Sequence, residues 1–470
     1  MHPKHPLIPV FVLFVLEPLA SLAQGFTSID KMQTGLDFTN AIREEAGRNI
    51  GAYDYFFNGG GVAIGDVNND GRPDIFLSGN DTDDQLFLNQ GNWQFQNATK
   101  TAGIRSGGWS TGVTMADVNG DGWLDIYVCR SGPDYATTST ANLLYLNQGD
   151  GSFKEVAKEY GIAGNDLSTQ AVFFDMDNDG DLDLFVLNHA VRNWANSEAD
   201  WHAFVDRMDP DTYARFCNKL YRNDNNTYTD ISRESGMYEI GFGLGVAIAD
   251  YDLDGDLDMA LSDTEDQALL RNEGDGTFVE VADASGVQRP GIFWGTVFAD
   301  FDLDGWPDLY MATNTEGNGC WRNLGAGMFE DVSEASGAAD SRASYGVAYA
   351  DYDRDGDVDL VVCNGGTGYR LYRNTANPDT RWVGVRLVGS GPVNASAIGA
   401  RVTLELSDGR SILHEIKSGS SMGSGNDLGL RFGLGDAEPV RLRVRWPDGL
   451  LEETTTVPKG TEIVWAYPTP

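Results

Sequence analysis

The sequence predicts an all-β protein: a β-propeller, with six blades favoured over seven, followed by a small C-terminal β domain. Three observations predict this fold. An aspartate-rich phrase recurs six times in 470 residues, the same short apolar runs surround every copy, and the excess of acidic residues ends with the last copy. Four short strands in each ~50 residues, bounded by Gly, Asn and Asp, are typical of a propeller blade.

Each repeat contains four runs that predict strands. A short apolar run precedes the aspartate phrase, an alternating run follows it, a third run carries Leu-Tyr or a similar pair, and the fourth reads F-x-x-V/A-x-x-x-x-G. Only five copies of the fourth run follow the others, and a sixth lies at the front of the chain, from Phe38 through Ile42 to Gly47. We therefore expect this N-terminal strand to complete the last blade and close the ring. The phrases begin at Asp66, Asp117, Asp175, Asp250, Asp300 and Asp351.

The overall composition excludes several classes of protein. With 41% hydrophobic and 11% aromatic residues the chain can build a large core, so its formal net charge of −38 does not signal disorder. That charge argues against nucleic acid or an anionic membrane surface as a partner. No stretch approaches the ~20 apolar residues of a transmembrane segment.

Composition also divides the chain. Residues 1–23 have a basic start, a short apolar run and a small-residue end at Ala23, which predict a cleaved signal peptide. The protein is then secreted or extracytoplasmic, in the periplasm or at the cell surface if it is bacterial. Residues 24–376 form the predicted propeller, with an insertion at about 189–216, and residues 377–470 form the tail domain. The cysteines allow two disulfides or four free buried thiols: Cys129, Cys217, Cys320 and Cys363.

The aspartate phrase has the pattern D-x-[DN]-x-D-G-x-x-D. Oxygen atoms at alternate positions of a tight loop converge on one point, and the glycine at position six permits the turn. Hard oxygen ligands at this density suit Ca²⁺, so we predict a calcium-loop propeller that binds up to six ions. Either the ions only fasten the loops, or they have a direct ligand-bridging or catalytic role.

We expect side-chain ligands at positions one, three, five and nine, with a backbone carbonyl at position seven. The expected ligands are Asp66, Asn68, Asp70 and Asp74 in loop one; Asp117, Asn119, Asp121 and Asp125 in loop two; Asp175, Asp177, Asp179 and Asp183 in loop three; Asp250, Asp252, Asp254 and Asp258 in loop four; Asp300, Asp302, Asp304 and Asp308 in loop five; and Asp351, Asp353, Asp355 and Asp359 in loop six.

The repeats and the tail resemble known modules. The six D-x-D-x-D-G-x-x-D phrases resemble FG-GAP/VCBS repeats. The tail contains W-V-G-V-R-L, I-G-A-R-V, S-G-S-S, L-R-F-G-L-G and V-R-W-P-D-G, and it resembles the ASPIC/UnbV domain. Together the modules resemble the cartilage acidic protein family and its bacterial relatives. The resemblance implies secretion, Ca²⁺ binding and adhesion or matrix contact, and some relatives are encoded with natural-product pathways.

One predicted strand of the tail carries a row of basic residues. Arg441, Arg443 and Arg445 alternate with apolar residues, so they share one face of the strand. That face is either a solvated sheet surface or a cationic patch that docks on the acidic propeller or on an anionic ligand.

The predicted ligand face is the rim opposite the aspartate loops. The insertion and the loops that enter each first strand lie there, and they are rich in aromatic residues, which suit glycan stacking, peptide anchoring or an apolar small molecule. The alternative is that these residues pack between blades. The candidate ligand-binding residues are Trp109, Trp194, Trp201, Phe242, Phe293, Trp294 and Tyr345. The weaker candidates for acid–base chemistry are His189, His202, Glu198 and Asp200.

These observations favour a secreted, Ca²⁺-stabilised binding or adhesion protein that recognises a glycan, a matrix or surface protein, or a small-molecule ligand. The alternative is a cofactor-independent enzyme, a cyclase, isomerase or lyase, acting on an apolar natural product at the propeller mouth. A purely structural role is the third hypothesis. Nothing in the sequence resembles a nucleophile elbow, a phosphate loop or a zinc motif.

Overall fold

The computed structural model describes most of the chain. It covers residues 25–468 apart from 54, 58, 106, 135, 177–178, 192–204, 236–237, 239, 241–243, 263–266, 275–277, 316, 366–367 and 376–380. The predicted signal peptide and the centre of the predicted insertion therefore lie outside the described residues.

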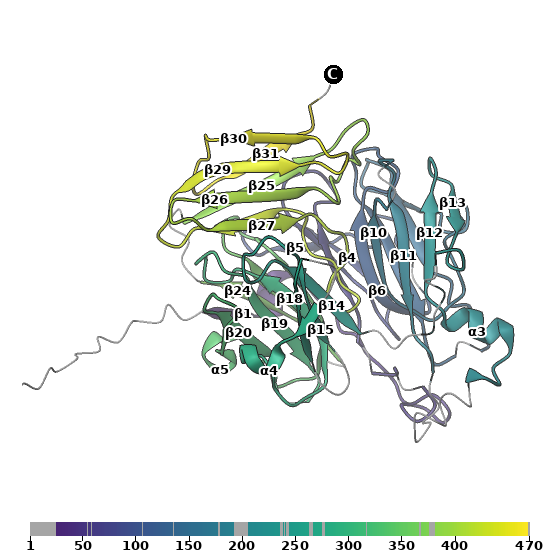
Figure 1. The fold of residues 1–470 in the computed structure, drawn as a ribbon. Helices are drawn as coiled ribbons and strands as arrows, with labels where there is room; N and C mark the ends of the chain where they lie inside the picture. The colour runs from purple at the N-terminus through teal and green to yellow at the C-terminus, as the bar shows by residue number, and fades with distance from the viewer. Residues whose placement is uncertain are drawn as a thin grey trace, which may run out of the picture.

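Six four-stranded antiparallel sheets make up the propeller in the part of the chain that the structure describes (Figure 1). Blades one to three are β2 (Val62–Gly65), β3 (Asp74–Leu77), β4 (Gln85–Asn89) and β5 (Phe95–Asn97); β6 (Trp109–Ala116), β7 (Asp125–Ser131), β8 (Leu143–Asn147) and β9 (Phe153–Glu155); and β10 (Ser168–Phe174), β11 (Asp183–Asn188), β12 (Lys219–Asn223) and β13 (Tyr228–Asp230). Blades four to six are β14 (Gly245–Ala249), β15 (Asp258–Ser262), β16 (Ala268–Asn272) and β17 (Phe278–Glu280); β18 (Phe293–Ala299), β19 (Asp308–Thr313), β20 (Gly319–Asn323) and β21 (Phe329–Asp331); and β22 (Ser344–Ala350), β23 (Asp359–Asn364), β24 (Gly368–Asn374) and β1 (Phe26–Ile29).

The N-terminal strand closes the ring, which confirms six blades, but it is not the strand predicted from Phe38. It is β1, in which Phe26 pairs with Asn374 of β24. The reason lies in the turn after each fourth strand. A Cβ on Gly337 would lie 2.3 Å from the Phe26 carbonyl oxygen, as a Cβ on Gly286 would lie 2.9 Å from that of Phe329. Phe26 therefore occupies the position that the other fourth-strand aromatic residues occupy.

The first strand of each blade lies nearest the propeller axis. Strand β2 contacts β6 and β22, and β18 contacts both β14 and β22. These inner strands are largely buried, with all eight residues of β6 and all seven of β18 shielded from solvent. Short helices lie outside the sheets: α1 (Lys31–Thr34), α3 (Pro210–Phe216), α4 (Ala282–Ser285) and α5 (Ser333–Ser336). Helix α3 lies within the predicted insertion.

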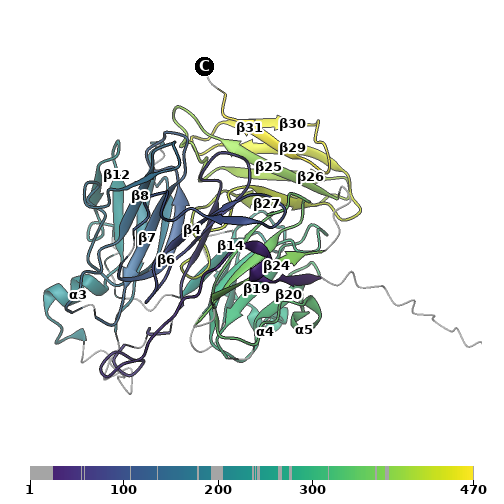
Figure 2. The ribbon, with the colours of Figure 1, turned by 180° about the vertical axis from the view of Figure 1, so that it is seen from behind.

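The tail domain packs two sheets face to face. One has the order β28 (Leu430–Gly433), β25 (Trp382–Val388) and β31 (Glu462–Ala466), and the other has the order β27 (Ser411–Glu415), β26 (Arg401–Leu406), β29 (Pro439–Arg445) and β30 (Leu451–Thr454). Alternate residues of β25, β26 and β29 point into one core that contains Val385, Leu404, Leu442 and Val444. Figure 2 shows this domain lying across one end of the propeller.

A loop of the tail domain, residues 417–427, enters the centre of the propeller. Its backbone bonds to the inner strands: Gly425 N donates to Val62 O at 2.9 Å, Val113 N to Gly423 O at 3.0 Å, and Ser421 N to Val246 O at 2.9 Å. We call this segment the axial loop. It occupies the propeller axis, so the two predicted domains share one core.

Glycines on the inner strands admit the axial loop. Five of the six blades carry Gly five residues before the first aspartate, and a Cβ there would lie 3.0 Å or less from an axial-loop atom: Gly61, Gly112, Gly245, Gly295 and Gly346. At Gly61 the distance from the Cβ to the Gly423 carbonyl oxygen would be 1.8 Å. Any side chain at these positions would occupy the space of the axial loop.

Candidate metal centres and ligand face

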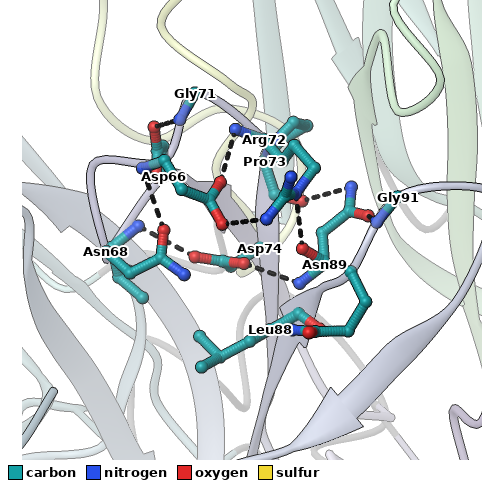
Figure 3. Close-up of polar contacts among 12 residues, drawn as sticks. Asp66, Asn68, Gly71, Arg72, Pro73, Asp74, Leu88, Asn89 and Gly91 are labelled. Carbon is teal, nitrogen blue, oxygen red and sulfur yellow. Dashed lines mark hydrogen bonds and ion pairs between the residues drawn. The ribbon is translucent and has the colours of Figure 1, made fainter.

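The aspartate loops turn tightly because their own carboxylates accept backbone N–H groups. In loop one, Asp66 accepts from Asp70 N at 3.0 Å and from Gly71 N, and Asn68 also accepts from Asp70 N at 3.0 Å (Figure 3). Gly71 has a φ of +82°, which glycine adopts at no steric penalty. The same bonds recur in loop two, where Asp117 accepts from Asp121 N and Gly122 N. In all six loops the glycine N–H at position six donates to the aspartate at position one.

Three loops bring three carboxylates within 4.8 Å of one another. They are Asp250, Asp252 and Asp254; Asp300, Asp302 and Asp304; and Asp351, Asp353 and Asp355. These residues stand at positions one, three and five of loops four, five and six, and their role as cation ligands remains a prediction. Loops one and two carry Asn at position three, and Asp177, at position three of loop three, lies outside the described residues.

The electrostatics of these clusters fit a cation. Burial, and then the Asp254 carboxylate, raises the pKa of Asp250 to about 7. Burial and the carboxylates of Asp304 and Asp302 hold the pKa of Asp300 well above its usual range. Carboxylates that repel one another in a desolvated loop are stabilised by a divalent cation. Oxygen atoms, three of which converge in each of these loops, are the donors that Ca²⁺ prefers. The buried acidic clusters could therefore bind metal ions.

The aspartate at position nine accepts hydrogen bonds from two backbone N–H groups, which the sequence pattern did not indicate. Asp74 accepts from Val67 N at 3.0 Å and from Asn89 N at 2.7 Å, while Asn89 Nδ2 donates to Pro73 O at 3.1 Å (Figure 3). Burial is the first cause that raises the pKa of Asp74, to about 8. The same backbone bond joins Asp125 to Asn147, Asp183 to Asn223, Asp258 to Asn272, Asp308 to Asn323 and Asp359 to Asn374.

Position nine therefore ties the loop to the third strand of its blade. Its role as a cation ligand remains a prediction, because each carboxylate oxygen keeps a second lone pair. The signal for the asparagine was present in the sequence: the third run of every repeat ends in Asn, as in Asn89, Asn147 and Asn374.

The tail domain covers the face that carries the aspartate loops. Arg431 Nε lies 3.2 Å from Asp351 Oδ2, and Gly435 N donates to Leu303 O at 2.8 Å. Asp117 N donates to Ser396 Oγ at 3.2 Å. The candidate metal loops thus lie at an interface between the two domains.

The basic row of the tail lies on β29, in the four-stranded sheet of that domain. Arg443 pairs with Glu405 at 3.0 Å, and Arg441 pairs with Glu405 and with Glu453. Arg445, at the end of the same strand, is exposed. In the described residues this row therefore forms a salt-bridged sheet face.

The predicted aromatic ligand residues that the structure describes are buried: Trp109, Phe293, Trp294 and Tyr345. Trp294 and Tyr345 have ring centroids 5.3 Å apart, and both pack in one cluster with Trp109 and with Met422 at the tip of the axial loop. Phe293 packs on Trp321 of the same blade, within a cluster that joins blades four and five. Trp194, Trp201 and Phe242 lie outside the described residues. Ligand contact by these residues remains a prediction.

The predicted acid–base residue His189 lies in a closed hydrogen-bond network. Its Nε2 is 2.9 Å from both Ser131 Oγ and Tyr53 OH, and its ring stacks on Tyr55 with centroids 3.8 Å apart. Burial lowers the pKa of His189 to about 3, so the ring is neutral at pH 7. His202, Glu198 and Asp200 lie outside the described residues. The described cysteines form no disulfide, and all four are buried.

A polar cleft of about 550 Å³ opens on the rim opposite the aspartate loops. It lies between blades one and two. Arg48 crosses it, bonding to Asp81 and, at 2.9 Å, to Asp134, while its guanidinium lies 5.3 Å from the Trp109 ring centroid. Arg130 lines the same cleft, and Trp109 Nε1 has no hydrogen-bond partner among the described residues. The sequence pattern indicated Trp109 but not these charged neighbours.

The fold and the loops define a class: a six-bladed repeat propeller with acidic loops and a fused β domain. Residues 58–128, 133–186, 250–311 and 300–362 match the FG-GAP-like repeat family, and residues 390–469 match the ASPIC and UnbV family. The chain belongs to the FG-GAP-like repeat family and carries an ASPIC and UnbV domain. No helix in the described residues is long and apolar enough to cross a membrane.

Curated relatives agree with the suspected cartilage acidic protein family. The chain is 27% identical over 219 residues to cartilage acidic protein 1 of Mus musculus, and 26% identical over 222 residues to that of Homo sapiens. Each alignment covers 45% of this chain and only 29% of the relative. The activity and partners of the whole relatives therefore do not transfer directly.

Two solved propeller structures resemble this chain weakly in sequence and in structure. A six-bladed fucose-recognising lectin of Aleuria aurantia is 9% identical, with a TM-score of 0.37 over 68% of this chain and 96% of the lectin. A lectin of Agrocybe aegerita that recognises terminal N-acetylglucosamine is 18% identical, with a TM-score of 0.33 over 68% of this chain and 81% of that one. Similarity at this level carries no argument about what this chain binds.

Proposed function

We propose that this chain is a secreted, calcium-stabilised binding protein that recognises an extracellular glycan, protein or small molecule through the face opposite the aspartate loops. The proposal rests on one observation: the two ends of the propeller carry different groups of residues. One end holds the acidic loops beneath the tail domain, and the other holds the polar cleft between Arg48, Trp109, Arg130 and Asp134.

Calcium is the cation that suits the loops best. Every expected donor is a carboxylate, amide or carbonyl oxygen, which are the ligands that Ca²⁺ prefers, and secreted proteins meet millimolar Ca²⁺. In loop one, Asp66 is half-buried and Asp70 is exposed, which leaves room for water in the coordination shell of the ion.

We place ligand recognition at the cleft because the axial loop fills the centre of the propeller. Because the axial loop occupies the centre and Met422 packs among the aromatic residues, the central mouth offers little room for a ligand. The cleft at the rim remains accessible, and it combines an aromatic ring, two guanidinium groups and a half-exposed carboxylate, Asp134. Such a mixture suits hydroxyl-rich or polar ligands.

The test is a ligand screen with glycans, matrix proteins and polar metabolites, using wild type beside Asp134→Ala. Asp134 has a side chain that is 48% exposed, so its removal should leave the fold intact. Asp150→Ala is the matched control, because Asp150 is exposed at the opposite end. Loss of binding in the Asp134 variant alone supports the proposal. Equal binding by all three proteins would place the ligand elsewhere.

A further inference from the structure

Loop six carries one carboxylate more than the pattern requires. Position seven is Arg72, Trp123, Asp181, Asp256 and Trp306 in loops one to five, and Asp357 in loop six. Loop six therefore contains five carboxylates within nine residues: Asp351, Asp353, Asp355, Asp357 and Asp359.

Asp357 differs from the other position-seven acids in its surroundings. It is 0% exposed, and neither of its carboxylate oxygens accepts a hydrogen bond from an N–H group or a hydroxyl group of the described residues; the group in contact with it is the Asp355 carboxylate. Asp256 and Asp181 are both half-exposed, and Asp181 accepts from Asn225 N at 2.6 Å.

The strongest charge interactions of Asp357 are with other carboxylates. Its carboxylate faces those of Asp355, Asp351 and Asp353, with Asp355 the closest. Those neighbours have partners of their own: Asp351 pairs with Arg431 at 3.2 Å, and Asp353 pairs with Arg373 at 2.8 Å. Asp355 pairs with the same Arg373 at 3.2 Å, and Asp359 accepts backbone N–H groups from Tyr352 and Asn374. Asp357 has neither an arginine nor an N–H donor in the described residues, and its carboxylate lies beside that of Asp355, one of the three that converge within 4.8 Å.

The tail domain packs on the backbone next to Asp357. Trp382 packs so closely on Gly356 that a Cβ there would lie 2.0 Å from the indole ring. Arg431 lies over the same indole, with its guanidinium 5.6 Å from the ring centroid. A fully buried carboxylate without a hydrogen-bond donor or a counter-charge is strongly unfavourable, and a divalent cation bound between the carboxylates supplies the missing positive charge.

We propose that Asp357 is a side-chain ligand of the cation in loop six, and that loop six binds its ion more tightly than the other loops do. The inference rests on the proposed calcium binding and adds a ligand that the nine-residue pattern does not contain. A fourth carboxylate beside positions one, three and five strengthens the attraction, because affinity in such loops rises with the number of charged ligands. Trp382 and Arg431 belong to the tail, so the ion in loop six also holds the two domains together.

The experiment compares Asp357→Asn with Asp256→Asn. Chelator-treated proteins are titrated with CaCl₂ by calorimetry, and bound ions are counted by native mass spectrometry at low free Ca²⁺. We expect the tightest binding step of the wild type to weaken roughly tenfold or more in Asp357→Asn and to remain in Asp256→Asn. Identical titrations for wild type and Asp357→Asn would overturn the inference while leaving calcium binding in place. A wild type that binds no Ca²⁺ would instead refute the proposed function.

Thermal unfolding of the same proteins provides a second readout. Asparagine has the shape of aspartate without its charge, so in chelator the Asp357→Asn protein should melt at the same temperature as wild type or higher, since one repulsive charge is gone. Its gain in melting temperature on adding Ca²⁺ should be smaller. A variant that melts lower than wild type in chelator, or fails to fold there, would show that the carboxylate serves the fold without a cation, and the inference would be wrong.

Discussion

Gly61 of the first inner strand lies against Gly423 of the axial loop, so closely that a Cβ on Gly61 would be 1.8 Å from the Gly423 carbonyl oxygen. The same Cβ would be 2.8 Å from Thr111 O in the neighbouring blade. Two backbones from residues far apart in sequence thus meet without any side chain between them. The tail domain is part of the propeller's core, because its loop takes the place that side chains would otherwise fill.

Replacing Gly61 with alanine should separate the axial loop from blade one. The new methyl group meets backbone on two sides and cannot be relieved by rotating a side chain, so we expect a loss of about 3 kcal/mol in the free energy of unfolding. Urea unfolding measures the loss. Faster proteolysis of the tail relative to wild type should accompany it.

Gly425→Ala is the matched control for this substitution. A Cβ at Gly425, in the same axial loop, would be 3.6 Å from Thr114, which is an ordinary van der Waals contact. Its unfolding midpoint should stay close to that of wild type. If the two alanine variants were equally stable, close packing of the axial loop would not explain the glycine at position 61.

Asp74→Asn and Asp70→Asn should separate the fold from cation binding. Asp74 accepts two backbone N–H groups, and an asparagine can accept only one of them, so we expect a loss of about 1–3 kcal/mol both in Ca²⁺ and in chelator. Asp70 is exposed at the loop, and its variant should be destabilised only when Ca²⁺ is present. Chemical unfolding under both conditions measures the difference. An Asp74 variant that matched wild type in chelator would contradict a structural role.

The sequence was sufficient for the blades because the aspartate phrase marks the turn between the first and second strand of each one. The closing strand was placed wrongly because Phe26 and Phe38 both precede a glycine at the same spacing. Only packing separates the two: Gly337 lies against the Phe26 carbonyl oxygen, whereas Gly47, the glycine after Phe38, has no atom within 4 Å of an added Cβ.

The position of the axial loop could not be predicted from the sequence. Its Ser and Gly residues are typical of an exposed loop, and no local pattern indicates that they pack against the inner strands. The five inner-strand glycines hinted at a close approach, yet the approaching segment lies more than 100 residues away for most of them. Likewise, residue type does not distinguish an aspartate that binds a cation from one that accepts backbone N–H groups, and Asp74 can do both.

Removing the cation should lower the stability of the whole chain. With affinities of ~10⁻⁴–10⁻³ M, millimolar Ca²⁺ contributes about 0.5–1.5 kcal/mol at each site. Summed over several loops, we expect excess chelator to lower the melting temperature by roughly ten degrees or more. Restoring Ca²⁺ should restore the melting temperature. Superimposable melting curves with and without chelator would refute cation binding by the loops.

Acid should destabilise the protein through His189, on the face away from the aspartate loops. Its pKa falls from 6.5 to about 3 on folding because burial opposes the charged ring. The unfolded chain therefore binds the proton more readily than the folded one, so stability is full above pH 6.5 and is lost as the pH falls toward 3. At pH 5 this single group should lower the free energy of unfolding by about 2 kcal/mol.

The effect of His189 is separated from that of the carboxylates by comparing wild type with His189→Gln. The urea-unfolding free energy of the variant is subtracted from that of wild type at pH 7.5 and at pH 5. A difference that did not change with pH would mean that the ring is already charged, or accessible to protons, in the folded protein.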